Sequence, residues 1–187
     1  MANQGSLVEN INVREYTNGR TAVVECHGTT FAIQFSPGRY GGFTESYLAA
    51  QLSDALGRLM ASRERARIAA LAEATGGEVV DPSLADPDTR QFHKVETGLV
   101  AQGGGGDVRV RTKGKLQWKV DIAEGALARL SQGEFESRFT AAVLDALRDF
   151  TLQRAAAKRD VLGVDFMHMA DAAKAAIEGR DGQNGDR

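Results

Sequence analysis

Alternating apolar and polar residues near the start of the chain predict a small antiparallel sheet. Between residues 21 and 35 every second residue is apolar, first before Gly28 and then after it. A shorter strand at 14–17 precedes Asn18-Gly19, a dipeptide that favours a type I′ hairpin turn because both positions tolerate positive φ. We expect three strands whose inward rows are Ala22, Val24 and Cys26, then Phe31, Ile33 and Phe35.

A second set of strands is expected after residue 90. Residues 91–100 are interpreted as a strand, and Gly103–Gly106 as a flexible connector. Val108 and Val110 then alternate with basic residues, and Lys113-Gly114 forms a turn. The last strand presents an inward row of Leu116, Trp118, Val120 and Ile122.

Each set of strands leads into a long amphipathic helix, and the two helices align at an offset of 91 residues. The apolar positions recur at helical spacing and give one stripe per helix, and Thr44 is placed to cap the first of them. Ala/Arg-rich segments, 62–74 and 153–162, continue both helices beyond what a small sheet covers. The aligned pairs include Leu48 with Phe139, Leu52 with Val143, Ala55 with Ala146, Leu59 with Phe150 and Arg63 with Arg154.

This internal repeat predicts an α+β fold of two tandem βββα units with long helices. The first unit spans 8–75 and the second 90–163. Residues 76–89 between them are interpreted as an acidic linker containing Pro82 and Pro87. Residues 164–187 are expected to form a short helix and a disordered tail.

Composition excludes a wholly disordered chain, because 42% of the 187 residues are hydrophobic and 26% are charged. The single cysteine, Cys26, fits a reducing compartment. The N-terminus lacks the basic and apolar regions of a signal peptide, and no stretch approaches the roughly 20 apolar residues of a membrane span. We therefore expect a cytoplasmic protein.

The formal net charge of −2 argues against a polycation but conceals local bias. Residues 73–89 carry five acidic side chains and no Lys or Arg, whereas 109–119 carries five basic side chains and no acidic one. These basic residues form either a solvated face or a surface that meets phosphates or an acidic partner protein. The candidate binding residues are Arg109, Arg111, Lys113, Lys115 and Lys119 in the strands, and Arg58, Arg63, Arg65 and Arg67 in the first helix.

No set of residues in the sequence predicts catalysis, a metal site or a cofactor. His27, His93 and His168 lie in different segments, and the Met-His-Met triplet around His168 points its side chains in different directions on a helix. Cys26 is expected to be a small buried hydrophobe. Gly103–Gly106 lacks the Gly-Lys-Ser/Thr ending of a phosphate loop. We expect a protein that is not an enzyme.

The second unit resembles the YbaB/EbfC family of small nucleoid-associated proteins. The resemblance rests on a three-stranded meander, the loop Asp121-Ile122-Ala123-Glu124-Gly125-Ala126-Leu127-Ala128-Arg129-Leu130-Ser131 and the amphipathic helix Phe135–Ala157. It covers about residues 107–162, and more weakly 12–72, where Ser36–Gly42 replaces the longer loop. Actinobacterial proteins of type VII secretion loci, of the EspD, EspH and EspL kinds, are also similar. Members of the family dimerise and bind DNA, so two units in one chain imply an intramolecular pseudo-dimer.

Two functions follow as expectations from the resemblance and the charge pattern. The first is a protein-interaction adaptor or chaperone of a type VII secretion system, whose partner is a secretion substrate or component. The alternative is a nucleoid-associated protein that binds double-stranded DNA with weak sequence preference through the basic strand face. In either case the helix tails are candidate surfaces for self-association into a homo-oligomer.

Overall fold

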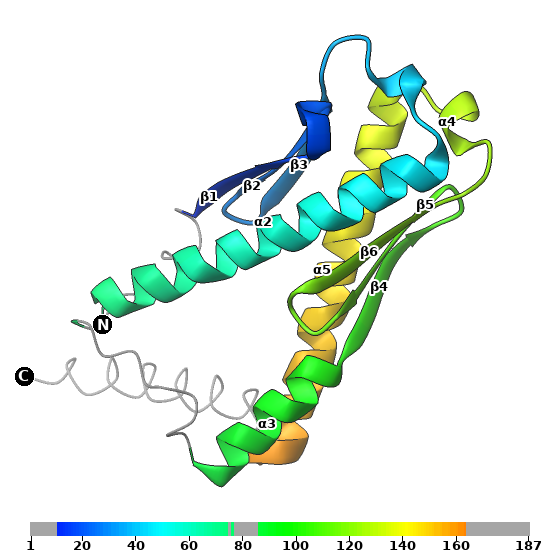
Figure 1. Cartoon of the computed structure of the whole chain (residues 1–187). Helices are drawn as coiled ribbons and strands as arrows, with labels where there is room; N and C mark the ends of the chain where they lie inside the picture. The colour runs from blue at the N-terminus through cyan, green and yellow to red at the C-terminus, as the bar shows by residue number, and fades with distance from the viewer. Residues whose placement is uncertain (1–10, 75, 77–85, 164–187) are drawn as a thin grey trace, which may run out of the picture.

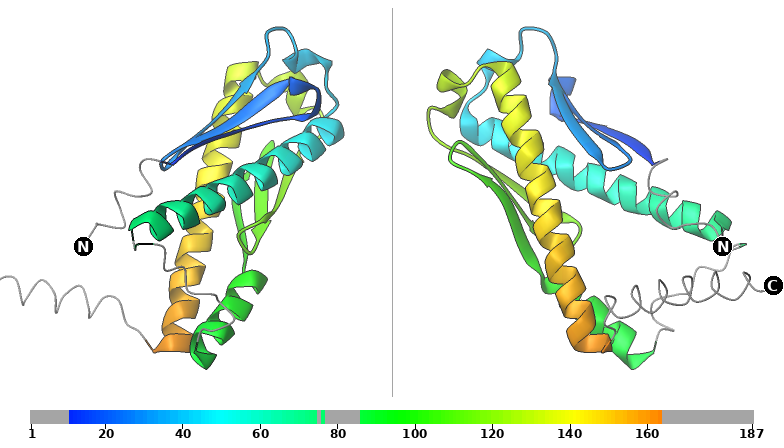
Figure 2. Two further views of the ribbon diagram at one scale, coloured as in Figure 1. Left: turned by 60° about the vertical axis from the view of Figure 1, so that its left-hand side comes forward. Right: turned by 180° about the vertical axis from the view of Figure 1, so that it is seen from behind.

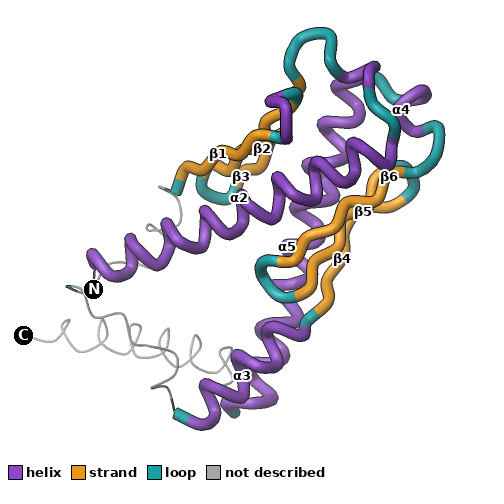
Figure 3. The backbone as a smooth tube through the Cα atoms, viewed as in Figure 1, coloured by secondary structure: helices purple, strands orange, loops and turns teal. Residues whose placement is uncertain are grey.

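The structure, a computed structural model, describes residues 11–74, 76 and 86–163. It is α+β, with two three-stranded antiparallel sheets and two long helices (Figures 1 and 3). Sheet A contains β1 (Asn12–Tyr16), β2 (Ala22–His27) and β3 (Thr30–Phe35), and sheet B contains β4 (Val100–Gly105), β5 (Val108–Lys113) and β6 (Gln117–Ile122). The helices are α2 (Glu45–Ala74), α3 (Pro87–Gly98), α4 (Ala126–Arg129) and α5 (Gln132–Leu162).

Sheet A follows the predicted alternation, and its six expected inward residues are buried. The β1–β2 turn is different from the expected one. Positive φ falls on Gly19 and Arg20, one residue later than an Asn18-Gly19 type I′ turn requires. The buried Thr17 closes this turn: its hydroxyl accepts from Ala22 N at 2.9 Å and donates to Ala22 O at 3.1 Å. The Thr17 hydroxyl therefore supplies hydrogen bonds at the turn, where the extra residue interrupts the backbone pairing of β1 and β2.

The prediction of a strand over residues 91–100 is wrong, because residues 87–98 form the helix α3. Asp86 caps this helix by accepting a hydrogen bond from Thr89 N at 2.9 Å, and Pro87 occupies the first turn, where its missing N–H costs nothing. The end of the predicted linker thus belongs to a helix. The remainder of that linker, 77–85, and the segment 164–187 lie outside the described residues.

Gly103–Gly106 is not the flexible connector that composition suggested. Gly103 to Gly105 complete strand β4, in register with Val110 to Val108 of β5. A Cβ built on Gly103 would come within 2.6 Å of Asp145 Cβ and closer still to the backbone of α5. The glycine lets α5 lie directly on the strand, a recognised reason for glycine inside a sheet.

The inward row of β6 is confirmed at Trp118 and Val120, which are buried, and in part at Ile122. Leu116 departs from it and is 53% exposed. It lies just before β6 begins, in the turn that Lys113-Gly114 opens with positive φ at Gly114. The pleat that orders the other three residues does not extend to it.

Both predicted helical stripes are confirmed. Thr44 caps α2, its hydroxyl accepting from Tyr47 N at 3.4 Å. Helix α5 begins at Gln132, three residues before the expected start, because Ser131 and Glu134 form a reciprocal capping box. The buried residues are Leu48, Leu52, Ala55, Leu56, Leu59 and Met60 on α2, and Phe135, Phe139, Ala142, Val143, Ala146 and Phe150 on α5.

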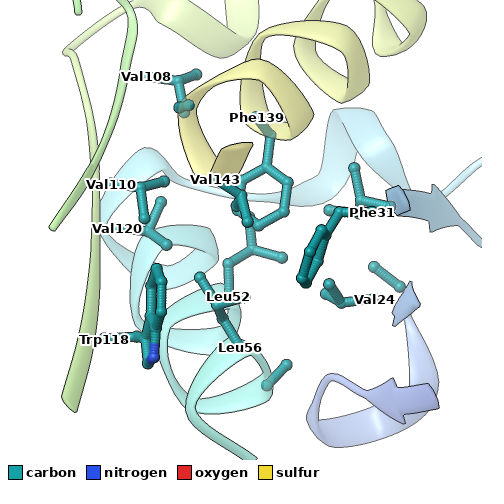
Figure 4. Packing of buried hydrophobic residues seen from close by; sticks show 14 of the residues in the cluster. Val24, Phe31, Leu52, Leu56, Val108, Val110, Trp118, Val120, Phe139 and Val143 are labelled. Carbon is teal, nitrogen blue, oxygen red and sulfur yellow. The ribbon is translucent and has the colours of Figure 1, made fainter. Parts of the chain in front are cut away.

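One hydrophobic cluster draws on both sheets and both long helices. The helices cross and then diverge, and each contacts strands of both sheets: α2 meets β1, β2 and β6, while α5 meets β3, β4 and β5 (Figures 1 and 2). In Figure 4, Leu52 and Phe139 lie between Phe31 of sheet A and Val120 of sheet B. Neither sheet therefore has a separate core of its own.

Two hydrogen bonds between the halves of the chain involve residues at equivalent positions of α2 and α5, 91 residues apart. Glu45 of α2 accepts from Leu127 N at 3.4 Å, and its counterpart Glu136 of α5 accepts from Phe35 N at 3.4 Å. Each carboxylate thus reaches a backbone N–H in the other half of the chain. Ser53 of α2 adds a further link by accepting from Val120 N at 2.8 Å.

Candidate functional site

The outer face of sheet B gathers four basic side chains, and we call it the basic face. Arg109, Arg111 and Lys113 alternate along β5 and point away from the core, while Lys119 lies opposite Arg111 on β6. Asp121 of β6 lies opposite Arg109 and is the acidic side chain of this face. Period-two alternation produces this arrangement, since the intervening Val108, Val110 and Thr112 are buried.

Only part of this basic charge is neutralised. Arg111 donates to Asp121 at 2.7 Å and Lys119 lies 3.4 Å from the same carboxylate. Partial burial acts to raise the pKa of Asp121, but the hydrogen bonds and charges of Arg111 and Lys119 outweigh it, so this pKa is lowered. The side chains of Arg109 and Lys113 form no ion pair or hydrogen bond with the residues that the structure describes. They are the basic groups of this face that are open to a partner.

Lys115 does not share the basic face, although the sequence groups it with the other four. It lies at the tip of the β5–β6 hairpin, 3.5 Å from Glu64 of α2 and 3.4 Å from Glu96 of α3. Glu96 is nearly fully buried, and it also pairs with Arg154 of α5. These ion pairs tie the hairpin to three helices.

The four arginines of α2 serve mainly within the fold. Arg58 pairs with Asp54 and with Glu15 of β1, and Arg67 makes a two-pronged contact with Glu64 at 2.9 Å. The other two, Arg63 and Arg65, have no carboxylate partner among the described residues: Arg63 lies over the Phe31 ring and donates to Gly28 O, and Arg65 donates to Ser62 Oγ.

The corresponding face of sheet A is closer to electrical balance. Arg14 pairs with Glu25 at 2.6 Å, and His27 lies 3.3 Å from the same carboxylate. The two sheets therefore differ in the chemistry that they present outward, and the excess of basic side chains belongs to sheet B.

A half-open cleft of about 280 Å³ lies where α2 and α5 diverge. Sequence reasoning did not identify it. In the sequence, Arg154 stands out only as the counterpart of Arg63, and Glu96 falls within the predicted strand 91–100. The 91-residue offset between the two helices is the signal that brings Arg63 and Arg154 together. An apolar wall formed by Met60, Trp118, Leu147 and Phe150 meets basic residues Arg63, Arg67, Lys115 and Arg154, with Glu64 and Thr151 completing the lining.

The two carboxylates around this cleft both have a pKa below the ordinary value of a glutamate. Hydrogen bonds from Arg67 are the main cause that lowers the pKa of Glu64 to about 2, assisted by the charge of Lys115. Burial acts to raise the pKa of Glu96, but Arg154 and Lys115 outweigh it and the pKa is lowered. Both carboxylates therefore offset part of the surrounding positive charge.

The described residues contain no group of three His, Cys, Asp or Glu side chains able to hold a metal ion, and His168 with its flanking methionines lies outside them. Cys26 is buried, donates to Gly28 O at 3.3 Å, and has a pKa raised chiefly by burial. Within the same part of the chain, no helix combines the length and apolar character needed to cross a membrane.

Comparison with protein families, with curated proteins and with solved structures finds no match to this chain. The resemblance to the YbaB/EbfC family stays a prediction that rests on the residues quoted for it.

Proposed function

We propose that the protein is a non-catalytic adaptor that binds an acidic segment of a partner protein on the basic face of sheet B. The observation that carries this proposal is the unpaired state of Arg109 and Lys113 beside a half-neutralised Arg111 and Lys119. Such a surface attracts carboxylates and selects against basic partners.

The size and edges of the face favour a protein over a nucleic acid. Arg109 to Lys113 spans about 13 Å of strand, since residues rise by about 3.3 Å each. Val100, paired with Lys113 across β4 and β5, is 57% exposed and adds an apolar contact at one end. A partner segment with acidic and apolar side chains matches both features, as in protein interfaces that combine apolar and charged groups.

The arrangement of the two units supports the proposal that they form an intramolecular pseudo-dimer of the YbaB/EbfC kind. Glu45 and Glu136 make reciprocal hydrogen bonds across the crossing, and Arg63 and Arg154 line one cleft. The more specific role, as an adaptor or chaperone of type VII secretion, rests on the sequence resemblance of residues 107–162.

Double-stranded DNA is the second candidate partner, because no acidic residue pairs with Arg109 or Lys113 in the described structure. Four basic side chains neutralise at most four phosphates. The expected slope of log affinity against log salt is then about −3.6, which is a loss of about 150-fold between 50 and 200 mM salt. A slope near zero argues against DNA.

The test compares two variants of equal net charge. Arg109→Gln/Lys113→Gln removes two positive charges from sheet B, and Thr30→Glu/Gln34→Glu adds two negative charges at the same spacing on the outer face of sheet A. Fluorescence anisotropy follows binding of a labelled Glu/Leu-rich peptide and of a labelled 20-base-pair duplex. The first variant should lose at least ten-fold in peptide affinity, while the second keeps it.

Equal losses in both variants would show that net charge alone governs binding, and the proposed surface would be wrong. Tighter binding of the duplex than of the peptide, with the steep salt slope, would favour the DNA alternative.

A further inference from the structure

The cleft between α2 and α5 combines basic and apolar side chains and lies apart from the basic face of sheet B. Its two sides come from corresponding positions of the two helices: Arg63 of α2 and Arg154 of α5 are 91 residues apart in sequence and line the same cavity. Trp118 forms part of the wall and donates its indole N–H to Lys115 O at 2.8 Å, which holds the ring in place.

The charges of the cleft do not cancel. Four basic side chains line it, against Glu64 in the lining and Glu96 behind it. Arg67 and Lys115 are engaged with Glu64, and Arg154 with Glu96. Arg63 is different: it has no carboxylate partner in the described structure, and its Nε is buried without a hydrogen-bond partner there. The guanidinium charge of Arg63 is therefore not offset by a carboxylate, and an anion bound in the cleft would supply the opposite charge.

The opposite wall is apolar, formed by Met60, Trp118, Leu147 and Phe150. At roughly 30 Å³ for the share of one water molecule, a cavity of this volume admits about nine to ten non-hydrogen atoms. We propose that the cleft binds a small amphipathic anion, with its oxyanion at Arg63 and Arg154 and its apolar body against Trp118 and Phe150. This site is separate from the basic face, so each can be tested without the other.

Trp118 is the single tryptophan of the chain and therefore reports directly on the cleft. Its fluorescence is followed while the full-length protein is titrated with octanoate, pentyl phosphate, octanol and octylammonium, all below their micelle concentrations. Saturable changes are expected for one or both anions, at concentrations at least ten-fold lower than for octanol, and octylammonium should not bind. The octanoate and pentyl phosphate arms distinguish a carboxylate from a phosphate ligand.

Charge placed at the exposed rim provides the matched test. Thr151 lines the cleft and is exposed, so Thr151→Glu should keep the fold and weaken anion binding at least ten-fold. Leu152→Glu adds the same charge one residue away, at a side chain that is 65% exposed and does not line the cleft, and should leave binding within about two-fold. Arg63→Gln should also weaken the anions while leaving octanol unchanged.

Three outcomes would overturn the proposal: no saturable change with either anion, equal binding of octanol and octanoate, or equal loss in Thr151→Glu and Leu152→Glu. Because none of these variants alters Arg109 or Lys113, peptide binding on sheet B should be unchanged in all of them.

Discussion

Replacing Gly103 by alanine tests whether α5 rests directly on the backbone of β4. The new methyl group would lie 2.6 Å from Asp145 Cβ and closer still to the backbone of Ala142 and Ala146. These are backbone atoms or lie next to backbone, so the contact is not relieved by a side-chain rotation. The helix would have to lift, and this would loosen Val143 from the shared core.

Overpacking of this kind costs about 1–3 kcal/mol and occasionally more, partly offset by about 0.4–1 kcal/mol because alanine restricts the unfolded chain. A net loss of about 1.3 kcal/mol lowers Tm by roughly 3–5 °C in a chain of this size. Gly105→Ala is the control: it lies two residues along the same strand, has no atom within 4 Å of its Cβ and has no positive φ. Thermal unfolding followed by circular dichroism should show no loss for Gly105→Ala. Equal Tm values for the two variants would refute the close approach.

Three further predictions concern the core and the ion pairs. Ser53→Ala leaves Val120 N without its acceptor and should lower the free energy of unfolding by about 1–3 kcal/mol in urea titrations; an unchanged midpoint would show that this link contributes nothing. Phe139→Ala should lower it by about 3–5 kcal/mol, against less than 1 kcal/mol for Leu152→Ala at an exposed position, and similar values would contradict the assigned core. The pKa of Glu64 is about 2 in the folded protein against an ordinary value near 4.5, so its ionisation stabilises the fold above about pH 4.5 and this contribution is lost as pH falls toward 2. The Tm of Glu64→Gln should therefore fall less than that of the wild type between pH 5 and 2.5. Parallel plots of Tm against pH for the two proteins would contradict the ion pairs of Glu64 with Arg67 and Lys115.

The periodicity of apolar residues predicts most of the strands and helices and the residues that they bury. Burial on one side of a strand or helix repeats every 2 or 3.6 residues, so Val24, Ile33, Val120 and Phe139 could be assigned to the core from the sequence. The same reasoning placed Arg109 and Lys113 outward. These features depend on local geometry, which a sequence carries directly.

The errors came where tertiary contacts or local capping outweighed periodicity. Residues 91–100 lack a clear period, and the signal that decides their structure is the Asp86 cap followed by Pro87. Glycine composition suggested flexibility at Gly103, whereas the requirement comes from α5, which lies some 40 residues away in sequence. The cleft of Arg63 and Arg154 depends on the crossing of two helices, which no local pattern contains.

Both sheets and both long helices share one core, so they should unfold together. The chain provides one probe in each half: Cys26, buried in sheet A, and Trp118, in sheet B. Urea unfolding is followed at equilibrium by Trp118 fluorescence and by pulsed thiol labelling of Cys26. A shared core predicts coincident transitions with the same midpoint and slope. Labelling of Cys26 at urea concentrations where Trp118 is still native would contradict the claim, because it would show that sheet A unfolds while sheet B stays folded.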